Sequence, residues 1–472
     1  MGIETTVDVR ARLIAGNRQE FGEGYEALKF PSPDEAQRAT ERRDGVLSDL
    51  KGRVESGFGG TKLDCADLSP GCRICGEGGW SCLFISGRCN CSCFYCPTSQ
   101  DVTGVPTTNA VEFRTPADYV GYLERFAFAG ASISGGEPLL TPARTLAFVT
   151  AIKKRFGDGL HLWLYTNGTL VDGEILARLR DAGLDEIRFD IGATDYHLHK
   201  LRLAVGVIPT VTVEIPAVPE DVPLLKERMV EMGEAGVDYL NLHQLRLTPH
   251  NYPHLAARNY TFLHGEKVTV LDSELAALEL LNFSIDRKLG LPVNYCSFVY
   301  KNRYQGRASR LRNAPFLLKG HEALTGNGYI RTLTLLSAPE AVARQGDLFR
   351  AQGADPALWN SGTTKERLLF SPLLWPLVEF GDCRLLIGYA AARQLSAMTY
   401  RNPYVSVRVG ETKQVVIERS RVGREFELSD GEITAFAGAF LGEGTAQGQE
   451  FEGILSELAG YERTPEGLQD YY

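Results

Sequence analysis

Three closely spaced cysteines offer the most distinctive chemistry in this chain of 472 residues. Cys89, Cys93 and Cys96 stand in a C-x3-C-x2-C spacing on one short segment. Three thiolates can bind three irons of a cubic iron-sulfur cluster and leave the fourth iron without a protein ligand. Segments that only carry electrons normally supply four cysteines, so the open iron predicts a site where a small molecule coordinates and reacts. The plainer alternative is a zinc knuckle or a set of structural thiols.

A second motif follows about 40 residues later, where Gly135, Gly136 and Glu137 form the centre of Ser134-Gly135-Gly136-Glu137-Pro138. It comes directly after a predicted strand. Two glycines let the backbone approach a ligand closely, and exposed carbonyls can accept hydrogen bonds from an ammonium group. By itself this run is a weak signal, because many plain loops contain it.

Together the two motifs resemble the signature of the radical S-adenosylmethionine (radical SAM) superfamily, in which the residue before the last cysteine is aromatic, as Tyr95 is here. The resemblance implies that SAM chelates the open iron and that the GGEP run holds the amino group of SAM. Reductive cleavage would then give a 5'-deoxyadenosyl radical that abstracts a hydrogen atom from the substrate. It also implies a 4Fe-4S cluster, a reductase such as flavodoxin or ferredoxin, and a partial six-stranded (β/α)6 barrel.

Eight of the ten cysteines fall between Cys65 and Cys96, and such crowding in a long chain favours metal ligation over disulfides. Cys72 and Cys75 form a C-x2-C pair flanked by glycines, which suits a zinc clip, free thiols or an auxiliary iron-sulfur cluster. We expect Cys82 and Cys91 to be bystanders.

A second resemblance concerns the runs Gly71 to Cys75, Leu83 to Gly87 and Pro292 to Ser297. Together they are similar to a group of radical SAM proteins related to pyruvate formate-lyase activating enzymes, over residues 60 to 312. The resemblance implies that Cys72, Cys75 and Cys296 meet at an auxiliary cluster, with Cys65 as the fourth ligand. The segment Asn109 to Arg114 and the long tail depart from that group.

Strand and helix patterns alternate between residues 82 and 242 and predict a parallel sheet, either open or curled toward a barrel. Active residues should lie at the carboxyl ends of its strands. The predicted strands are 82–87, 131–134, 161–165, 186–190, 211–215 and 239–242, separated by helices that include 116–128, 142–156, 173–181 and 222–232.

Polar residues at later strand ends are candidate contacts for SAM or substrate. Thr166 and Asn167 stand where the family often binds the SAM carboxylate or ribose, although Asn-Gly is equally a turn signal. Asp190 could face ribose or substrate, cap a helix, or pair with Arg188. Glu214 interrupts an apolar strand, where an unpaired charge is costly. The sequence identifies no catalytic residue.

The predicted fold class is α/β, with a helical and cysteine-rich lead-in at 1–80, the partial barrel at 81–312 and an α+β domain at 313–472. We expect a lead-in helix at 34–57, whole or broken near Gly45. The last domain should contain strands at 329–336, 404–409, 415–420 and 425–428, the last three as a meander with a turn at 421–423. Its helices should span 338–352, 430–441 and 448–458. We expect this domain to cover the barrel mouth and shape the substrate pocket.

The composition of the chain limits which kinds of binding partner are expected. The net charge of -9 and the pI near 5.6 argue against nucleic acid as the main partner. The start has no export-signal pattern, and no apolar run approaches the roughly 18 residues that span a membrane. We therefore expect a cytoplasmic protein with no membrane partner.

These features predict a radical SAM enzyme acting on a small polar metabolite or natural-product intermediate, with an auxiliary cluster that anchors substrate, relays electrons or donates sulfur. One alternative is an activase that makes a glycyl radical on a partner protein. Another is a non-enzymatic zinc-binding interaction module.

Overall fold

The computed structural model describes residues 4–381, 383–442 and 451–472, which form two compact units. The barrel unit contains Val7–Gln305, Val409–Lys413 and Glu466–Tyr472. The C-terminal unit contains residues 4–6, Gly306–Arg408 and the described part of Gln414–Pro465.

The barrel unit is built on one large sheet, with the strand order β1-β2-β13-β10-β9-β8-β7-β6-β3-β4-β5 in the described residues. Its outermost strands are short: β1 (Ser56–Gly57), β4 (Thr107–Thr108) and β5 (Val111–Glu112). The six predicted strands are confirmed, and their neighbours pair in parallel. They are β3 (Trp80–Ser86), β6 (Gly130–Gly135), β7 (His161–Thr166), β8 (Glu186–Phe189), β9 (Thr210–Pro216) and β10 (Tyr239–His243).

The sheet continues past β10. Strand β13 (Val293–Cys296) pairs in parallel with β10 and places Cys296 opposite His243. On the far side of β13, strand β2 (Lys62–Leu63) pairs antiparallel, with Lys62 opposite Cys296. The N-terminal cysteine segment thus joins the barrel sheet directly.

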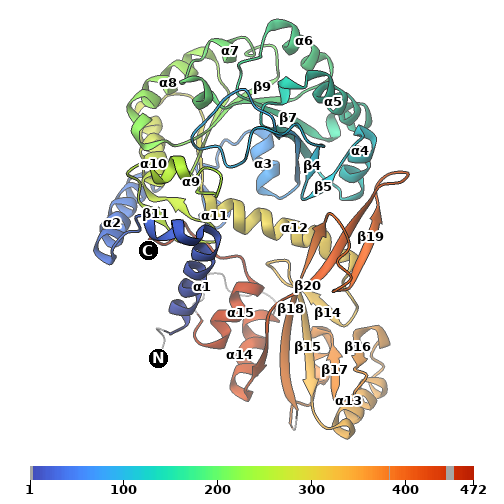
Figure 1. Ribbon diagram of the computed structural model, residues 1–472. Coiled ribbons are helices and arrows are strands. Elements are labelled where there is room, and N and C mark those ends of the chain that lie inside the picture. The colour runs from blue at the N-terminus through green and yellow to red at the C-terminus, as the bar shows by residue number, and fades with distance from the viewer. Residues whose placement is uncertain (1–3, 382, 443–450) are drawn as a thin grey trace. The chain divides into compact units, whose positions relative to one another are not determined.

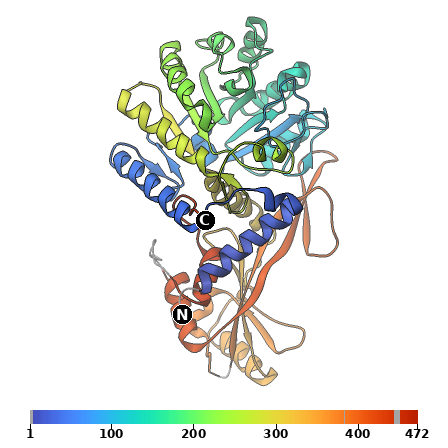
Figure 2. The same cartoon turned by 60° about the vertical axis from the view of Figure 1, so that its left-hand side comes forward.

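Helices form an arc outside the strands (Figures 1 and 2). Their starts follow from local chemistry. The Thr115 side chain accepts a hydrogen bond from the backbone N–H of Asp118, and Asp172 accepts one from Ile175. These helices are α4 (Pro116–Arg125), α5 (Pro142–Phe156), α6 (Gly173–Asp181), α8 (Val222–Ala235) and α10 (Leu271–Arg287). Because both faces of the sheet are covered, the strands carry long apolar runs such as Leu162–Leu164, which is fully buried.

The lead-in differs from the prediction. Helix α1 (Glu4–Phe21) was not predicted, and α2 (Pro33–Leu50) runs through Gly45 without a break and ends seven residues early. An internal glycine costs about 1 kcal/mol relative to alanine. The capping box between Ser32 and Glu35 and the burial of Leu50 within the barrel unit offset that cost.

The C-terminal unit holds an antiparallel sheet with the order β16-β17-β15-β18-β20-β19 in its described residues, plus β14 beside β15. Three of its strands are short: β14 (Glu322–Leu324), β16 (Trp359–Ser361) and β17 (Arg367–Phe370). Strands β15 (Ile330–Leu336) and β19 (Tyr404–Arg408) were predicted, as were helices α13 (Pro339–Ala351) and α14 (Asp430–Phe440). Helix α15 (Ile454–Glu462) starts later than predicted, and residues 448–450 of that prediction lie outside the described residues.

The predicted meander is confirmed only for its first hairpin, in which β19 pairs antiparallel with the start of the following strand. Its separate third strand at 425–428 is wrong. Residues 415–428 belong to one strand, β20 (Gln414–Leu428), which pairs with the unpredicted β18 (Arg384–Leu395) as well as with β19. The expected turn at 421–423 is an irregularity within this pair, where Gly423 has φ +66° and the register shifts. A glycine at positive φ is typical of a bulge, which resembles a turn in sequence.

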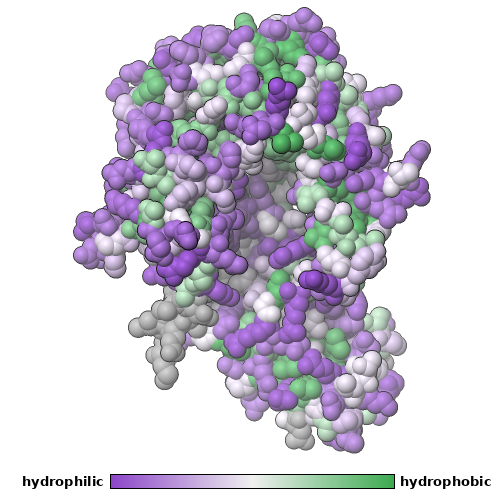
Figure 3. All heavy atoms as spheres, in the orientation of Figure 1, coloured by the Kyte–Doolittle hydropathy of each residue, from purple (hydrophilic) through white to green (hydrophobic). Residues whose placement is uncertain are grey.

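Hydrophilic side chains dominate the visible face of the barrel unit, with apolar residues scattered among them (Figure 3). No helix in the part of the chain that the structure describes is long and apolar enough to cross a membrane.

Candidate functional site

The cysteine loop follows β3, and the two glycines of the second motif bring the end of β6 against it. Gly135 has φ +139°, and a Cβ there would overlap the carbonyl of Ser86. A Cβ on Gly136 would overlap the carbonyl of Arg88, and the Gly136 N–H donates to Ser86 O at 2.8 Å. The glycines therefore allow two strand ends to touch just before the first cysteine.

Glu137 ties this motif to the next strand end. Its carboxylate is fully buried and accepts hydrogen bonds from Leu139 N (2.8 Å), Thr166 Oγ1 (3.0 Å) and Asn167 N (2.7 Å). It does not line the adjacent cavity, whereas Gly135 and Gly136 do. Glu137 fixes the end of β7 relative to the end of β6.

Asn167 in turn holds the start of the cysteine loop. Its Nδ2 donates to Asn90 Oδ1 at 2.9 Å and lies 3.6 Å from Cys89 Sγ. Cys89 N donates to Gln100 O at 3.0 Å, which closes the loop on itself. Sequence reasoning missed Asn90 and Gln100, although both are polar residues within or beside the cysteine run.

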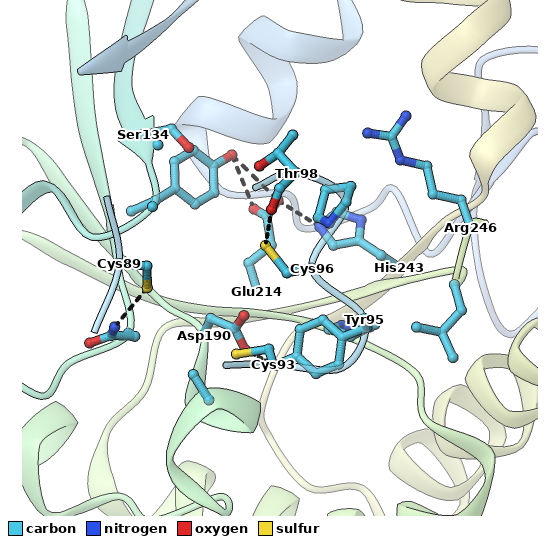
Figure 4. A pocket seen from close by; sticks show the side chains of 18 of the residues that line it. Cys89, Cys93, Tyr95, Cys96, Thr98, Ser134, Asp190, Glu214, His243 and Arg246 are labelled. Atoms are coloured by element: carbon cyan, nitrogen blue, oxygen red, sulfur yellow. Dashed lines mark hydrogen bonds and ion pairs between the residues drawn. The ribbon is translucent and has the colours of Figure 1, made fainter. Parts of the chain in front are cut away.

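The far end of the loop is fixed by Tyr95. Its hydroxyl donates to Asp190 Oδ1 at 2.9 Å (Figure 4), and its carbonyl accepts from Asn251 Nδ2 at 3.1 Å. Thr248 Oγ1 donates to Pro97 O at 3.1 Å. Burial raises the pKa of Asp190 to about 6. Asp190 forms no ion pair with Arg188, which was one of its predicted alternatives.

Thr248 and Asn251 help to hold the cysteine loop, but the sequence could not show this because they lie some 150 residues from the loop.

Glu214 lies at the centre of a buried ionic network. It contacts His243 Nε2 at 2.6 Å, Arg188 Nη1 at 2.5 Å and the Tyr165 hydroxyl at 3.3 Å. Arg188 also binds Glu186 at 2.8 Å. Burial opposes ionisation of Glu214, but His243 and Arg188 hold its pKa well below the usual range. The charge within this apolar strand is therefore matched inside the protein.

The remaining predicted ligands gather around a residue that sequence reasoning missed, the fully buried Lys62. Burial alone would lower the pKa of Lys62, but four nearby sulfurs raise it. These sulfurs belong to Cys65, Cys72, Cys75 and Cys296. The sequence signal that could have identified Lys62 is its position beside the apolar Leu63 and three residues before Cys65.

Polar donors surround this second group of thiols. Asn241 Nδ2 donates to Cys72 Sγ at 2.7 Å, and Gln305 Nε2 donates to Cys75 Sγ at 3.2 Å. Burial raises the pKa of Cys65 to about 11 and that of Cys296 to about 12, with Lys62 acting in the opposite direction. Metal binding here would release protons.

The donor chemistry of both cysteine groups is compatible with iron-sulfur clusters. A cubic cluster distributes its thiolates over different irons, and hydrogen bonds to the sulfurs tune it. Such donors are present beside Cys89, Cys72 and Cys75, namely the side-chain amides of Asn167, Asn241 and Gln305.

The strand ends enclose a cavity of about 650 Å³, within the range of small-molecule sites. Cys89, Cys93 and Cys96 line one part of it, together with Cys91. Of the predicted contacts, Tyr95, Gly135, Gly136, Thr166, Asn167, Asp190 and Glu214 also line it. Unpredicted lining residues include Tyr165, His243, Arg246, Lys301 and Gln305.

Comparison with known proteins identifies the class. Residues 83–205 match the family model described as the radical SAM superfamily. Over 278 residues the chain is 32% identical to the "Putative glycyl-radical enzyme activating enzyme" of Methanocaldococcus jannaschii, covering 56% of this chain and 72% of that protein. It is also 33% identical over 120 residues to the GTP 3',8-cyclase of Parasynechococcus marenigrum, covering 24% of this chain and 33% of that one.

The chain belongs to the radical SAM superfamily. It is an enzyme that uses SAM and a 4Fe-4S cluster, on a partial barrel. The interpretation as a non-enzymatic zinc-binding module is therefore wrong.

Among solved structures, the chain is similar to Streptococcus suis SuiB bound to S-adenosylmethionine, at 12% identity and a TM-score of 0.35, covering 66% of this chain and 69% of that one. Another is native anSMEcpe with bound AdoMet, at 15% identity and a TM-score of 0.35, covering 52% of this chain and 70% of that one.

Proposed function

We propose that Cys89, Cys93 and Cys96 hold the catalytic 4Fe-4S cluster and that the substrate binds in the same cavity. When bound, the cluster and SAM supply a 5'-deoxyadenosyl radical for hydrogen abstraction. The observation that carries the proposal is that the three cysteines and the ends of β6, β7 and β8 line one cavity of about 650 Å³.

The chain's own residues orient the cofactor. The backbone at Gly135 and Gly136 binds the SAM amino group, while Thr166 and Asn167 contact its carboxylate or ribose. Asp190, held by Tyr95, faces the ribose. Because Glu214 is already bound to Arg188 and His243, its role is to keep this wall of the cavity rigid and polar.

We also propose an auxiliary cluster on the thiols around Lys62, with the four ligands Cys65, Cys72, Cys75 and Cys296. Four cysteines would leave none of its irons open. This favours electron relay over substrate anchoring or sulfur donation. The Gln305 amide lines the cavity and donates to Cys75, so the second group of thiols lies one side chain away from the substrate.

The substrate is a small polar molecule in this proposal. A cavity of this size accommodates SAM and a compact partner molecule. The second candidate is an activase that acts on a partner protein, favoured by the printed name of the Methanocaldococcus relative. Copurification under argon with a large protein that acquires a glycyl radical would support the activase.

Anaerobic reconstitution tests the core of the proposal. The protein should bind iron and sulfide, its cluster EPR spectrum should change on addition of SAM, and a strong reductant should release 5'-deoxyadenosine. Cys93→Ala should abolish that release. Cys91→Ala is the matched control, because Cys91 lies in the same loop but has the wrong spacing for a ligand. Zinc without sulfide, or equal loss in both variants, would contradict the proposal.

A further inference from the structure

Two cationic side chains line the cavity without an ion pair to any residue that the structure describes. Arg246 follows β10, and Lys301 begins the short π-helix Lys301–Gln305. Within the described residues neither side chain forms an ion pair within 4.0 Å. A partly desolvated cation without a counter-charge is costly, which makes such a position a candidate for ligand binding.

The acidic side chains of this cavity are held by other partners. Glu214 binds Arg188 and His243, and Asp190 accepts a hydrogen bond from Tyr95. Lys301 is close enough to influence Glu214 and His243 but does not pair with either. Glu20 acts on Arg246 only from beyond ion-pair distance. Within the described residues, Arg246 and Lys301 are therefore cations of the cavity wall that no ion pair holds in place.

The two cations share one wall of the cavity. The Arg246 guanidinium lies over the Phe298 ring, 5.3 Å from its centroid. Lys301 follows Phe298 by three residues on a continuous helical segment, a spacing that places side chains on the same face. Short π-helices are frequent at functional sites because they redirect side chains. Here the π-helix also supplies Asn302 and Gln305 to the wall.

We propose that Arg246 and Lys301 bind an anionic group of the substrate, a carboxylate or a phosphate. A guanidinium presents paired N–H donors that match either group, and an ammonium adds a point charge. This inference rests on the proposed function, since it assigns the substrate class of the same cavity. In Figure 4, Arg246 lies apart from Cys89, and the substrate anion would occupy that end.

The same chemistry could also bind the carboxylate of SAM, and the test separates the two sources. Pyrophosphate serves as the probe, titrated calorimetrically under argon into the reconstituted protein saturated with SAM. Arg246→Gln and Lys301→Gln should each weaken pyrophosphate binding at least tenfold, and Arg246→Lys should weaken it less. SAM affinity, followed by the cluster EPR change, should shift less than twofold.

Arg114→Gln is the matched control, because Arg114 is a well exposed cation of the same unit. Its pyrophosphate affinity should equal that of the unmodified protein. Iron content confirms that each variant is loaded, and Lys301→Gln carries the test if Arg246→Gln does not fold. No pyrophosphate binding, or binding unchanged in both Gln variants, would overturn the inference. A parallel loss of SAM affinity would assign the cations to SAM instead.

These outcomes are distinct from failure of the proposed function. If the unmodified protein lacks iron and sulfide, or shows no EPR response to SAM, the cluster assignment fails whatever the anion data show. If both responses are present and pyrophosphate binding is insensitive to Arg246 and Lys301, only the subsite fails.

Discussion

The two cysteine groups of the barrel unit are built in opposite ways. Cys89, Cys93 and Cys96 come from one loop and line a cavity. The second group comes from three separate segments of the chain, and its sulfurs lie close enough to the buried Lys62 to raise the pKa of that lysine. We call Cys89, Cys93 and Cys96 the open group, and Cys65, Cys72, Cys75 and Cys296 the enclosed group. An open group suits a cluster that must admit a ligand, whereas an enclosed group with its own counter-charge suits a cluster that exchanges electrons.

The largest expected effect comes from the open group. Cys93→Ala should lower SAM cleavage by at least about 100-fold, because a cluster with two thiolates is not held in position. 5'-Deoxyadenosine release under a strong reductant measures the loss. Cys91→Ala should stay within about threefold of the unmodified protein. If Cys93→Ala kept more than a tenth of the SAM cleavage of the unmodified protein, the assignment of the open group would be contradicted.

The double variant Cys72→Ala, Cys75→Ala tests whether the groups are independent. It should lose about half of the bound iron and sulfide while retaining the EPR response to SAM, because each cluster has its own thiolates. Iron and sulfide analysis after anaerobic reconstitution gives the result. Loss of all iron, or of none, would contradict two separate clusters.

Lys62 provides a sharper test of the enclosed group. Lys62→Met removes a buried positive charge, and at an effective dielectric constant of 20 a charge a few ångströms away contributes about 2–3 kcal/mol. Since 59 mV corresponds to a tenfold change for one electron, the auxiliary cluster potential should fall by on the order of 100 mV. An EPR-monitored redox titration measures it.

Lys62→Arg is the matched control, because it keeps the charge and should restore most of the potential. The potential of the open cluster should be unchanged in both variants. If only the potential of the open cluster fell, Lys62 would lie beside the open group and the assignment would be contradicted.

The same contrast explains what the sequence could predict. Local patterns identified six parallel strands and the cysteine loop, because alternating apolar runs and short spacings are written in consecutive residues. They did not reveal that β13 extends the sheet and sets Cys296 opposite Lys62, because that pairing joins residues more than 230 positions apart. The resemblance to a known group named the cysteines of the enclosed site but not the lysine they surround.

Glu137 shows a subtler limit. Its motif predicted a cofactor contact, whereas the carboxylate is used to join the ends of β6 and β7 and only the neighbouring glycines reach the cavity. In the C-terminal unit, Gly423 gave the same local signal as a turn although it lies within one long strand. A sequence pattern indicates the local backbone conformation, but the neighbouring strand decides what structural role that conformation has.

The smallest expected effect concerns how rigidly the open loop is held. Tyr95→Phe removes the hydrogen bond to Asp190 and leaves that partly buried carboxylate without its hydroxyl donor, at a cost of about 1–3 kcal/mol. The melting temperature should fall by a few degrees, and SAM affinity should weaken by about two- to tenfold while the iron content stays unchanged. Tyr196→Phe is the control, because its hydroxyl donates to Asp221, away from the cysteine loop, and it should lower the melting temperature without weakening SAM binding. Equal weakening of SAM binding in both variants would mean that the open loop, like the enclosed group, depends on the stability of the whole barrel and not on Tyr95.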